Sequence, residues 1–242
     1  MNQHPSNKKQ ESGPYEFIEK VKTLRELPNI HHSKDTVAIK IPNGDKESPE
    51  VANIITYRQL HDLIEDTASA LVRIAGIEEG DVVSIPLPNT VEYVLSFLAV
   101  PWARGVSAPL NPNYTEKEYA FYMEDNKSKC VLVPKEGLPA AEAAAKSLGI
   151  PVYAVGWTAG GTDGGGGSVR VECKYDKEGT VAETMNGNSS ETQKDKLIFA
   201  PDPDDVALFL HTSGTTARPK VSNCTRKTRL HLIIAIETVN IV

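Results

Sequence analysis

The sequence predicts an α/β fold, an open and mainly parallel sheet with helices on both faces. Between residues 82 and 155, short apolar runs alternate with helix-length amphipathic segments in the order β-α-β-α-β-α-β. The run Cys130–Val133 is apolar without interruption, as expected of a strand that is buried on both faces. Two segments open with Thr followed three residues later by Gln or Glu, the pattern of a helix capping box.

We expect residues 1–13 to form a disordered leader, because they are polar and lack any periodic apolar pattern. The helical spacing of apolar residues predicts a helix over Tyr15–Leu27, which Pro28 would end. Strands are expected at Val37–Ile41 and near Ile54–Ile55.

The best-specified helix follows Thr56, whose side chain can cap it together with Gln59. Gly76 supplies a glycine at the position where helices commonly end. The residues predicted to share the buried face are Leu60, Leu63, Ile64, Ala68, Leu71 and Ala75.

The central elements continue this alternation. After the strand Val82–Ile85, Asn89 is expected to cap a helix, with Glu92 at the third position, and Pro101 to kink or end it. Its buried side is expected to hold Tyr93, Phe97 and Leu98. The remaining elements expected are the strand Val106–Leu110, a helix from Thr115 and Glu118 to about Asp125, the strand Cys130–Val133, the helix Pro139–Leu148 and the strand Pro151–Val155.

Residues 156–200 break the pattern and are predicted to be a flexible insert. The glycines of residues 164–167 contain no G-x-G-x-x-G frame and precede no Lys-Ser or Lys-Thr pair, which favours a solvated linker over a phosphate loop. Regular structure is expected to return with a buried strand at Val206–Leu210.

Composition narrows the functional classes. The chain has 242 residues, 40% of them apolar and 24% charged, which excludes collagen-like, fully disordered and coiled-coil proteins. The net charge of −6 argues against a nucleic-acid partner. The apolar tract Leu230–Val242 is too short to span a bilayer, and no secretory signal precedes residue 13. Cys130, Cys173 and Cys224 are too far apart for a zinc or disulfide motif, so we expect a soluble, cytoplasmic protein without a membrane partner.

The segment that follows the strand Val206–Leu210 has the composition of a polyphosphate site. A glycine lets successive backbone N–H groups converge on one anion, hydroxyls add neutral donors, and a lysine adds a mobile positive charge. Composition alone leaves a polar surface loop as an equal alternative, because G-x-x-x-x-G-K-[ST] is absent. The candidate residues are Thr212, Ser213, Gly214, Thr215, Thr216 and Lys220.

The string Ser213-Gly214-Thr215-Thr216-x-x-Pro219-Lys220 resembles the phosphate loop of the acyl-adenylate-forming superfamily. Four further motifs of that superfamily occur in family order, and the surroundings of the loop resemble its oxalate–CoA ligase branch, also described as 4-coumarate–CoA-ligase-like. These motifs are Thr56-Tyr57-x-x-Leu60, Gly76-Ile77-x-x-Gly80-Asp81-x-Val83, Leu87-Pro88-Asn89-x-x-Glu92 and Leu110-Asn111-Pro112-x-Tyr114-Thr115-x-x-Glu118.

The resemblance implies a two-step reaction. A carboxylate attacks the α-phosphate of ATP bound with Mg²⁺, which gives an acyl-adenylate and pyrophosphate, and the thiol of CoA then displaces AMP. It also implies that the six residues named above between Thr212 and Lys220 hold the β- and γ-phosphates.

Family likeness is expected to cover residues 14–220, a partial N-terminal AMP-binding domain, and to stop before a non-family tail over residues 221–242. The parts that this family places further downstream have no counterpart in the sequence, so no catalytic or metal-binding residue is assigned. These parts include the acyl pocket, the acidic magnesium ligand and the C-terminal domain with its catalytic lysine. We therefore expect a truncated product whose strand at Val206–Leu210 lacks partners.

Two hypotheses follow. In the first, the chain is the N-terminal fragment of an oxalate–CoA-type ligase, inactive by itself. In the second, it is a non-catalytic nucleotide-binding or regulatory short isoform that pairs with the full-length enzyme. A P-loop NTPase is disfavoured because Val221 follows Lys220. Asn240-Ile241-Val242 is not a peroxisomal targeting tripeptide, although the full-length family form is compatible with that compartment.

Other polar residues near the loop have structural interpretations. His211 is expected to orient the loop backbone rather than act as a base. Asp202, Asp204 and Asp205 are expected to line a solvated approach to the strand rather than hold Mg²⁺.

Overall fold

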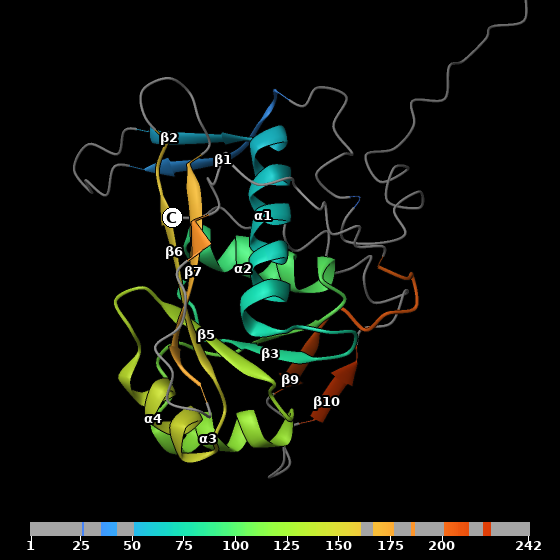
Figure 1. Cartoon of the computed structure of the whole chain (residues 1–242), viewed down its shortest axis with the longest axis vertical. Helices are drawn as coiled ribbons and strands as arrows, with labels where there is room; N and C mark the ends of the chain where they lie inside the picture. Colours follow the sequence, from blue (N-terminus) through green and yellow to red (C-terminus); the bar gives the residue numbers. More distant parts are fainter. Residues whose placement is uncertain are drawn as a thin grey trace, which may run out of the picture.

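The computed structural model describes Glu26 and residues 35–42, 51–160, 167–176, 185–186, 201–212 and 220–223 (Figure 1). The predictions for residues 1–13, for the helix over 15–27 apart from Glu26, and for most of the tail over 221–242 lie outside these residues. No helix in the described part of the chain combines the length and the apolar character that a membrane crossing requires.

The described elements follow one another in the order that the sequence predicts over the central region. They are β1 (Val37–Pro42), β2 (Val51–Thr56), α1 (Tyr57–Ala75), β3 (Val82–Ile85), α2 (Val91–Trp102), β4 (Val106–Pro109), α3 (Glu116–Asp125), β5 (Cys130–Pro134), α4 (Pro139–Ser147), β6 (Val152–Thr158), β7 (Ser168–Tyr175), β8 (Met185–Asn186), β9 (Phe209–Thr212) and β10 (Lys220–Asn223).

The main sheet is six-stranded, with the order β4-β3-β5-β6-β7-β8. The strands β4, β3, β5 and β6 run parallel to their neighbours, whereas β7 pairs antiparallel with β6 and β8 antiparallel with β7. Two antiparallel pairs, β1–β2 and β9–β10, form separate small sheets. The predicted α/β class with a mainly parallel open sheet is therefore confirmed.

Both faces of the main sheet are buried, as the apolar run of β5 predicted. Cys130 and Leu132 pack in the core formed with α1 and α2, whereas Val131 and Val133 pack in the core formed with α3 and α4. Figure 1 shows the same division, with α1 and α2 above β3 and β5 and with α3 and α4 below them. Alternate side chains of one strand thus enter two separate cores.

The helix α1 forms as its sequence predicts. Thr56 caps it, the side chain of Gln59 completes the capping box, and Gly76 ends it with a left-handed φ of 60°. All six residues predicted for the buried face are buried. The arginine in the last turn, Arg73, also suits the negative end of the helix dipole.

The start of α2 differs from the prediction. Thr90, not Asn89, occupies the N-cap position, and its side chain makes no capping hydrogen bond. Phe97 and Leu98 are buried as predicted, whereas Tyr93 is only half-buried. Pro101 lies in the last turn and the helix ends one residue later, so the proline terminates it instead of kinking its middle.

The prediction of a flexible insert over residues 156–200 is wrong for residues 156–158, which continue β6, for residues 168–175, which form β7, and for residues 185–186, which form β8. Val169, Val171 and Cys173 are buried, while the residues between them are exposed or half-buried. This period of two is a strand pattern, and the neighbouring glycines concealed it. Residues 161–166, 177–184 and 187–200 lie outside the described residues.

The capping box of α3 gives a test of helix stability. The hydroxyl of Thr115 accepts a hydrogen bond from the Glu118 amide, and the Glu118 carboxylate accepts hydrogen bonds from the Thr115 amide and hydroxyl at 2.8 and 2.7 Å. We expect Thr115→Ala to lower the free energy of unfolding by about 1 kcal/mol in urea titrations at pH 7. Thr90→Ala is the matched control, because that N-cap threonine makes no capping bond, and an equal loss there would contradict the assignment.

The same capping box should depend on pH. Hydrogen bonds from the Thr115 amide and hydroxyl lower the pKa of Glu118 below its usual range. A carboxylate with a lowered folded-state pKa stabilises the protein above its unfolded pKa, about 4.3 for Glu, and this contribution disappears as the pH falls through the folded pKa. The stability difference between wild type and Thr115→Ala should therefore shrink between pH 5 and pH 3, and a constant difference would contradict this account.

Candidate functional site

The structure brings the two ends of the predicted phosphate loop together. Thr212 is the last residue of β9 and Lys220 the first residue of β10, and the two are directly paired in the antiparallel ladder. The segment 213–219 therefore leaves and rejoins the same end of this two-stranded sheet. Of the other predicted site residues, Ser213, Gly214, Thr215 and Thr216 lie outside the described residues.

The residues that lead into this hairpin, 205–211, are called the approach segment, and they run beside β4. Leu208 forms a parallel bridge with Ser107, whose amide donates a hydrogen bond to the Ala207 carbonyl at 3.1 Å. The strand predicted at Val206–Leu210 is thus displaced toward the C-terminus, because Phe209–Thr212 pair with β10 instead. The expectation that this strand lacks partners is wrong, since Leu208 bridges to β4 and Phe209 and Leu210 pair with β10. Since the chain runs parallel to β4, the segment after Thr212 begins on the side of the carboxyl ends of the parallel strands, where ligands of open α/β sheets bind.

An ion pair fixes the start of this approach. The Arg104 guanidinium donates to both carboxylate oxygens of Asp205, at 2.9 and 3.0 Å, and also pairs with Glu79 at 2.8 Å. Its hydrogen bond to Asp205 raises the pKa of Arg104. Asp205 was expected to be solvated, but its side chain is only 14% exposed, so it serves as an anchor for the segment.

The acidic group that includes Asp205 does not offer a free magnesium site. Asp205 also accepts a hydrogen bond from the Asp202 amide at 2.8 Å, and Asp202 accepts one from the Asp204 amide at 2.8 Å. These bonds are those of a local turn. The side chains thus organise the backbone, and among the described residues they do not fit a Mg²⁺ ion that a nucleotide would bring.

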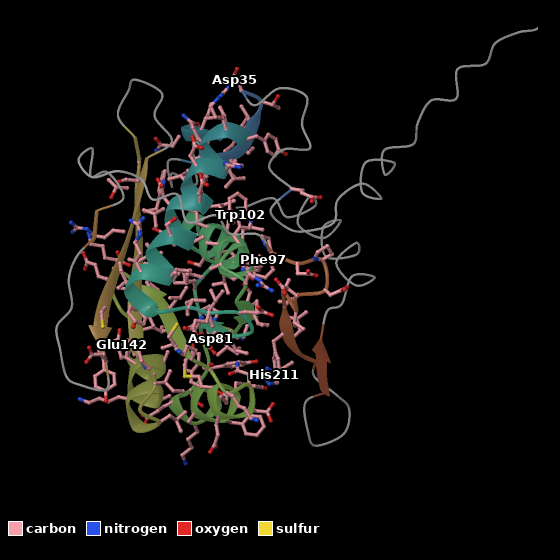
Figure 2. All side chains as sticks on the ribbon, turned by 45° about the vertical axis from the view of Figure 1, so that its right-hand side comes forward. Asp35, Asp81, Phe97, Trp102, Glu142 and His211 are labelled. Atoms are coloured by element: carbon pink, nitrogen blue, oxygen red, sulfur yellow. The ribbon has the colours of Figure 1, made fainter. Side chains whose placement is uncertain are left out.

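His211 connects the other end of the approach to α3. Its Nε2 lies 3.0 Å from the Asp125 carboxylate, and its ring packs edge-on against Tyr122 with centroids 4.6 Å apart. Figure 2 shows His211 where β9 meets the helices at the lower end of the molecule. The side chain is only 7% exposed. Asp125 was not among the predicted site residues, because it lies 86 positions earlier in the chain and no local pattern links the two.

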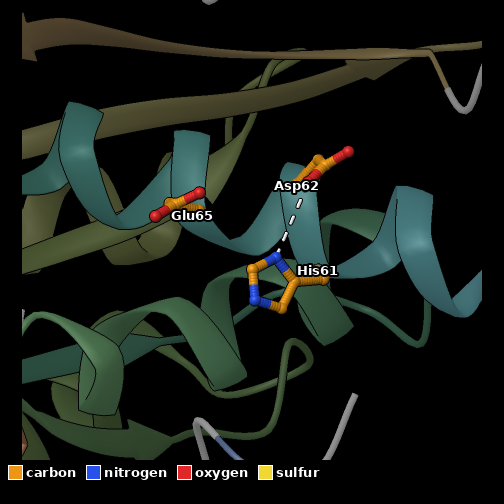
Figure 3. A group of neighbouring side chains, drawn as sticks. All are labelled: His61, Asp62 and Glu65. Carbon is orange, nitrogen blue, oxygen red and sulfur yellow. Dashed lines mark ion pairs between the residues drawn. The ribbon is translucent and has the colours of Figure 1, made fainter. Parts of the chain in front are cut away.

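A second group of polar side chains lies on α1 and was also not predicted. The donor atoms of His61, Asp62 and Glu65 lie within 4.8 Å of one another (Figure 3). The three residues come from one helix, and the Asp62 side chain is 68% exposed. The His61 ring packs edge-on against Trp102 at 5.1 Å, so packing between α1 and α2 explains its position.

Two of the three cysteines are described, and both are free and buried. Burial raises the pKa of Cys130 to about 12 and also raises that of Cys173. Both are therefore protonated thiols at neutral pH and poor nucleophiles. Neither contributes to a disulfide or to a candidate metal site.

A comparison of the sequence with models of protein families shows which family the chain belongs to. The model of the AMP-binding enzyme family matches residues 31–240. The chain belongs to the AMP-binding enzyme family. The match extends beyond Lys220, so the boundary between a family domain and a non-family tail at residue 220 stays a prediction.

Relatives within the AMP-binding family include CoA ligases. The chain is 41% identical over 186 residues to an oxalate–CoA ligase of Arabidopsis thaliana, with 77% of this chain and 33% of the relative covered. It is 30% identical over 224 residues to the oxalate–CoA ligase of Saccharomyces cerevisiae, with 86% and 37% covered. The chain thus spans about a third of the length of these curated relatives.

Solved structures with a similar fold agree with the architecture described for this chain. The chain is similar to MatB from Rhodopseudomonas palustris, solved with ATP bound, at a TM-score of 0.58 and 23% identity, with 85% of this chain and 35% of that chain covered. A long-chain-fatty-acid–CoA ligase from Archaeoglobus fulgidus gives a TM-score of 0.58 at 20% identity, with 89% and 39% covered. At these identities the likeness concerns the fold.

Proposed function

We propose that this chain carries the ATP phosphate-binding part of an acid–CoA ligase of the oxalate–CoA type. The observation that supports the proposal most strongly is the pairing of Thr212 with Lys220, which closes the segment 213–219 at the carboxyl side of a parallel sheet. Membership of the AMP-binding family and likeness to oxalate–CoA ligases support the choice of reaction.

The chemistry of the segment suits the β- and γ-phosphates of ATP. Both reactants of the first step, a carboxylate and a polyphosphate, are anions, so their approach requires neutralising charge and fixed geometry. In this proposal Lys220 supplies the charge, and the hydroxyl-bearing residues Thr212, Ser213, Thr215 and Thr216 together with the Gly214 backbone supply the hydrogen-bond donors. Mg²⁺ would arrive with the nucleotide, and CoA would enter at the second step in the longer family members.

The chain by itself is proposed to bind nucleotide without completing the reaction. It spans about a third of its curated relatives, and none of its residues is assigned to the acyl pocket or to acid–base chemistry. Incubation with ATP, Mg²⁺, oxalate and CoA is therefore expected to release no pyrophosphate above the protein-free rate. Release that depends on oxalate would overturn this part of the proposal.

Lys220 provides the sharpest test of the phosphate site. We expect Lys220→Ala to weaken ATP binding by about tenfold or more in isothermal titration calorimetry, because a charge-assisted hydrogen bond to phosphate contributes about 1.5–3 kcal/mol. Lys40→Ala is the control, since Lys40 is exposed on β1 at the far end of the molecule from β9 and β10 (Figure 1). Equal affinities of the two variants would contradict the proposed site.

A second function is favoured by the way in which the hairpin joins the fold. Among the described residues, a single isolated bridge, Ser107 with Leu208, joins this part of the chain to the six-stranded sheet, and it lies immediately before β9. Within the described part of the chain, β9 and β10 each pair on one side only, and strand edges of this kind suit pairing with another chain. We propose as the alternative a short regulatory isoform that binds the full-length ligase. Co-purification of the full-length oxalate–CoA ligase with this chain would support it, and a monomer that captures none would contradict it.

A further inference from the structure

We propose that Asp125 and His211 form a positioning contact that holds the start of the phosphate loop in its binding geometry. The inference rests on the proposed function, because it concerns the segment that we propose to bind the phosphates of ATP. It assigns roles to two side chains that lie outside that segment. One is on α3 and the other on β9.

The contact between His211 and Asp125 leaves the imidazole little freedom to move. The His211 Nε2 and the Asp125 Oδ2 atoms are 3.0 Å apart, and the His211 side chain is only 7% exposed, whereas that of Asp125 is 43% exposed. Tyr122 packs edge-on against the imidazole, and Phe209 lies with its ring centroid 5.1 Å from the imidazole centroid. Two rings and a carboxylate thus restrict the histidine, and fewer rotamers remain open to it.

The position of His211 in the chain explains why this restriction matters for a ligand. His211 immediately precedes Thr212, and consecutive Cα atoms are only about 3.8 Å apart. A displacement of His211 therefore moves Thr212 and its partner in the ladder, Lys220. Binding groups must be held within about 0.5 Å of their productive geometry, so loosening this contact would disperse the phosphate donors.

The contact also completes the attachment of the approach segment. Arg104 fixes its beginning through Asp205, and the bridge between Ser107 and Leu208 aligns its middle with β4. His211 fixes its end against α3. Without this contact, the end of the segment would be held only by the pairing of β9 with β10 and by the ring contacts of His211 with Tyr122 and Phe209, among the contacts described here.

The test compares variants that keep or remove the donor and the acceptor. His211→Leu and Asp125→Ala are each expected to weaken the binding of ATP and of inorganic tripolyphosphate by about tenfold. His211→Gln retains an N–H donor at a similar distance and should stay within about threefold of wild type. The double variant His211→Leu with Asp125→Ala should bind no more weakly than either single variant, because coupled residues act non-additively.

Glu142→Ala serves as the control for a merely structural effect. Glu142 pairs with Lys174 at 3.1 Å, its side chain is 33% exposed, and it also accepts a hydrogen bond from the Leu138 amide at 2.9 Å, away from β9 and β10. We expect it to lower the unfolding midpoint without changing ATP affinity. Equal losses of affinity in Glu142→Ala and His211→Leu, or multiplicative losses in the double variant, would overturn the positioning contact.

The outcomes separate this inference from the proposed function. If the wild-type chain binds neither ATP nor tripolyphosphate, the proposed function is overturned and the positioning role falls with it. If wild type binds both, Lys220→Ala binds weakly and His211→Leu binds like wild type, the phosphate site stands and only the positioning contact is overturned.

Discussion

Replacing Leu132 with alanine is expected to lower the free energy of unfolding by about 2–5 kcal/mol. Leu132 is fully buried in the middle of β5 and packs in the core shared with α1 and α2. Truncation removes apolar contacts and leaves a cavity that the sheet and the helices cannot close completely. Urea-induced unfolding followed by circular dichroism measures the loss.

The neighbouring residue tests whether β5 is buried on both faces. Val133 is also fully buried, but it packs with α3 and α4 on the opposite face. Val133→Ala should therefore also destabilise the protein, by roughly 1–3 kcal/mol. Ile54→Ala is the control, because that side chain is 47% exposed and its loss should cost less than about 0.5 kcal/mol. A neutral result at either Leu132 or Val133 would mean that one face of the sheet is open.

Replacing Arg104 with alanine is expected to detach the beginning of the approach segment. The Asp205 side chain would lose the two hydrogen bonds that it accepts from the guanidinium, although it is largely buried. The backbone bond from the Ser107 amide to the Ala207 carbonyl depends on this segment staying beside β4. We therefore expect hydrogen exchange of the Ser107 amide, measured by NMR, to accelerate about tenfold or more.

Two further variants sharpen the Arg104 experiment. Arg104→Lys keeps the charge but cannot reproduce the paired hydrogen bonds of a guanidinium, so its exchange rate should lie between wild type and Arg104→Ala. Arg58→Ala breaks a more exposed ion pair with Asp35 and should leave the Ser107 amide unchanged. Wild-type exchange in Arg104→Ala would show that Arg104 does not hold the segment.

The sequence predicted the central fold well because the physical signals there are local. The capping boxes that begin at Thr56 and Thr115 formed as predicted, since each depends on residues only three positions apart, whereas the one predicted at Asn89 and Glu92 did not form. The apolar run of β5 correctly indicated a strand covered by helices on both faces. At α2, Asn89 and Thr90 are adjacent residues that can both cap a helix, so the sequence could not decide between them.

The errors have equally specific reasons. The alternation of Val169, Val171 and Cys173 was present in the sequence, but nearby glycines favoured a linker, and pairing with β6 overrides that local preference. The strand predicted at Val206–Leu210 is displaced because Phe209–Thr212 pair with Lys220–Asn223, and pairing between strands cannot be derived from one strand alone.

The candidate site was predictable only in part. Thr212 and Lys220 were identified from the motif, and the structure pairs their backbones. Their supporting contacts, Arg104 with Asp205 and Asp125 with His211, join residues that are 101 and 86 positions apart. Such contacts arise only when the sheet order and the helix positions are known, so no sequence pattern indicates them.

The most direct test of the central claim is an NMR titration of the wild-type chain with ATP, tripolyphosphate and AMP. The account predicts that ATP and tripolyphosphate shift amide resonances mainly within residues 211–223, and that AMP at the same concentrations does not, because it lacks the β- and γ-phosphates. Shifts concentrated elsewhere, for example around His61 on α1, or equal responses to AMP and ATP, would contradict the assignment of this segment as the phosphate site.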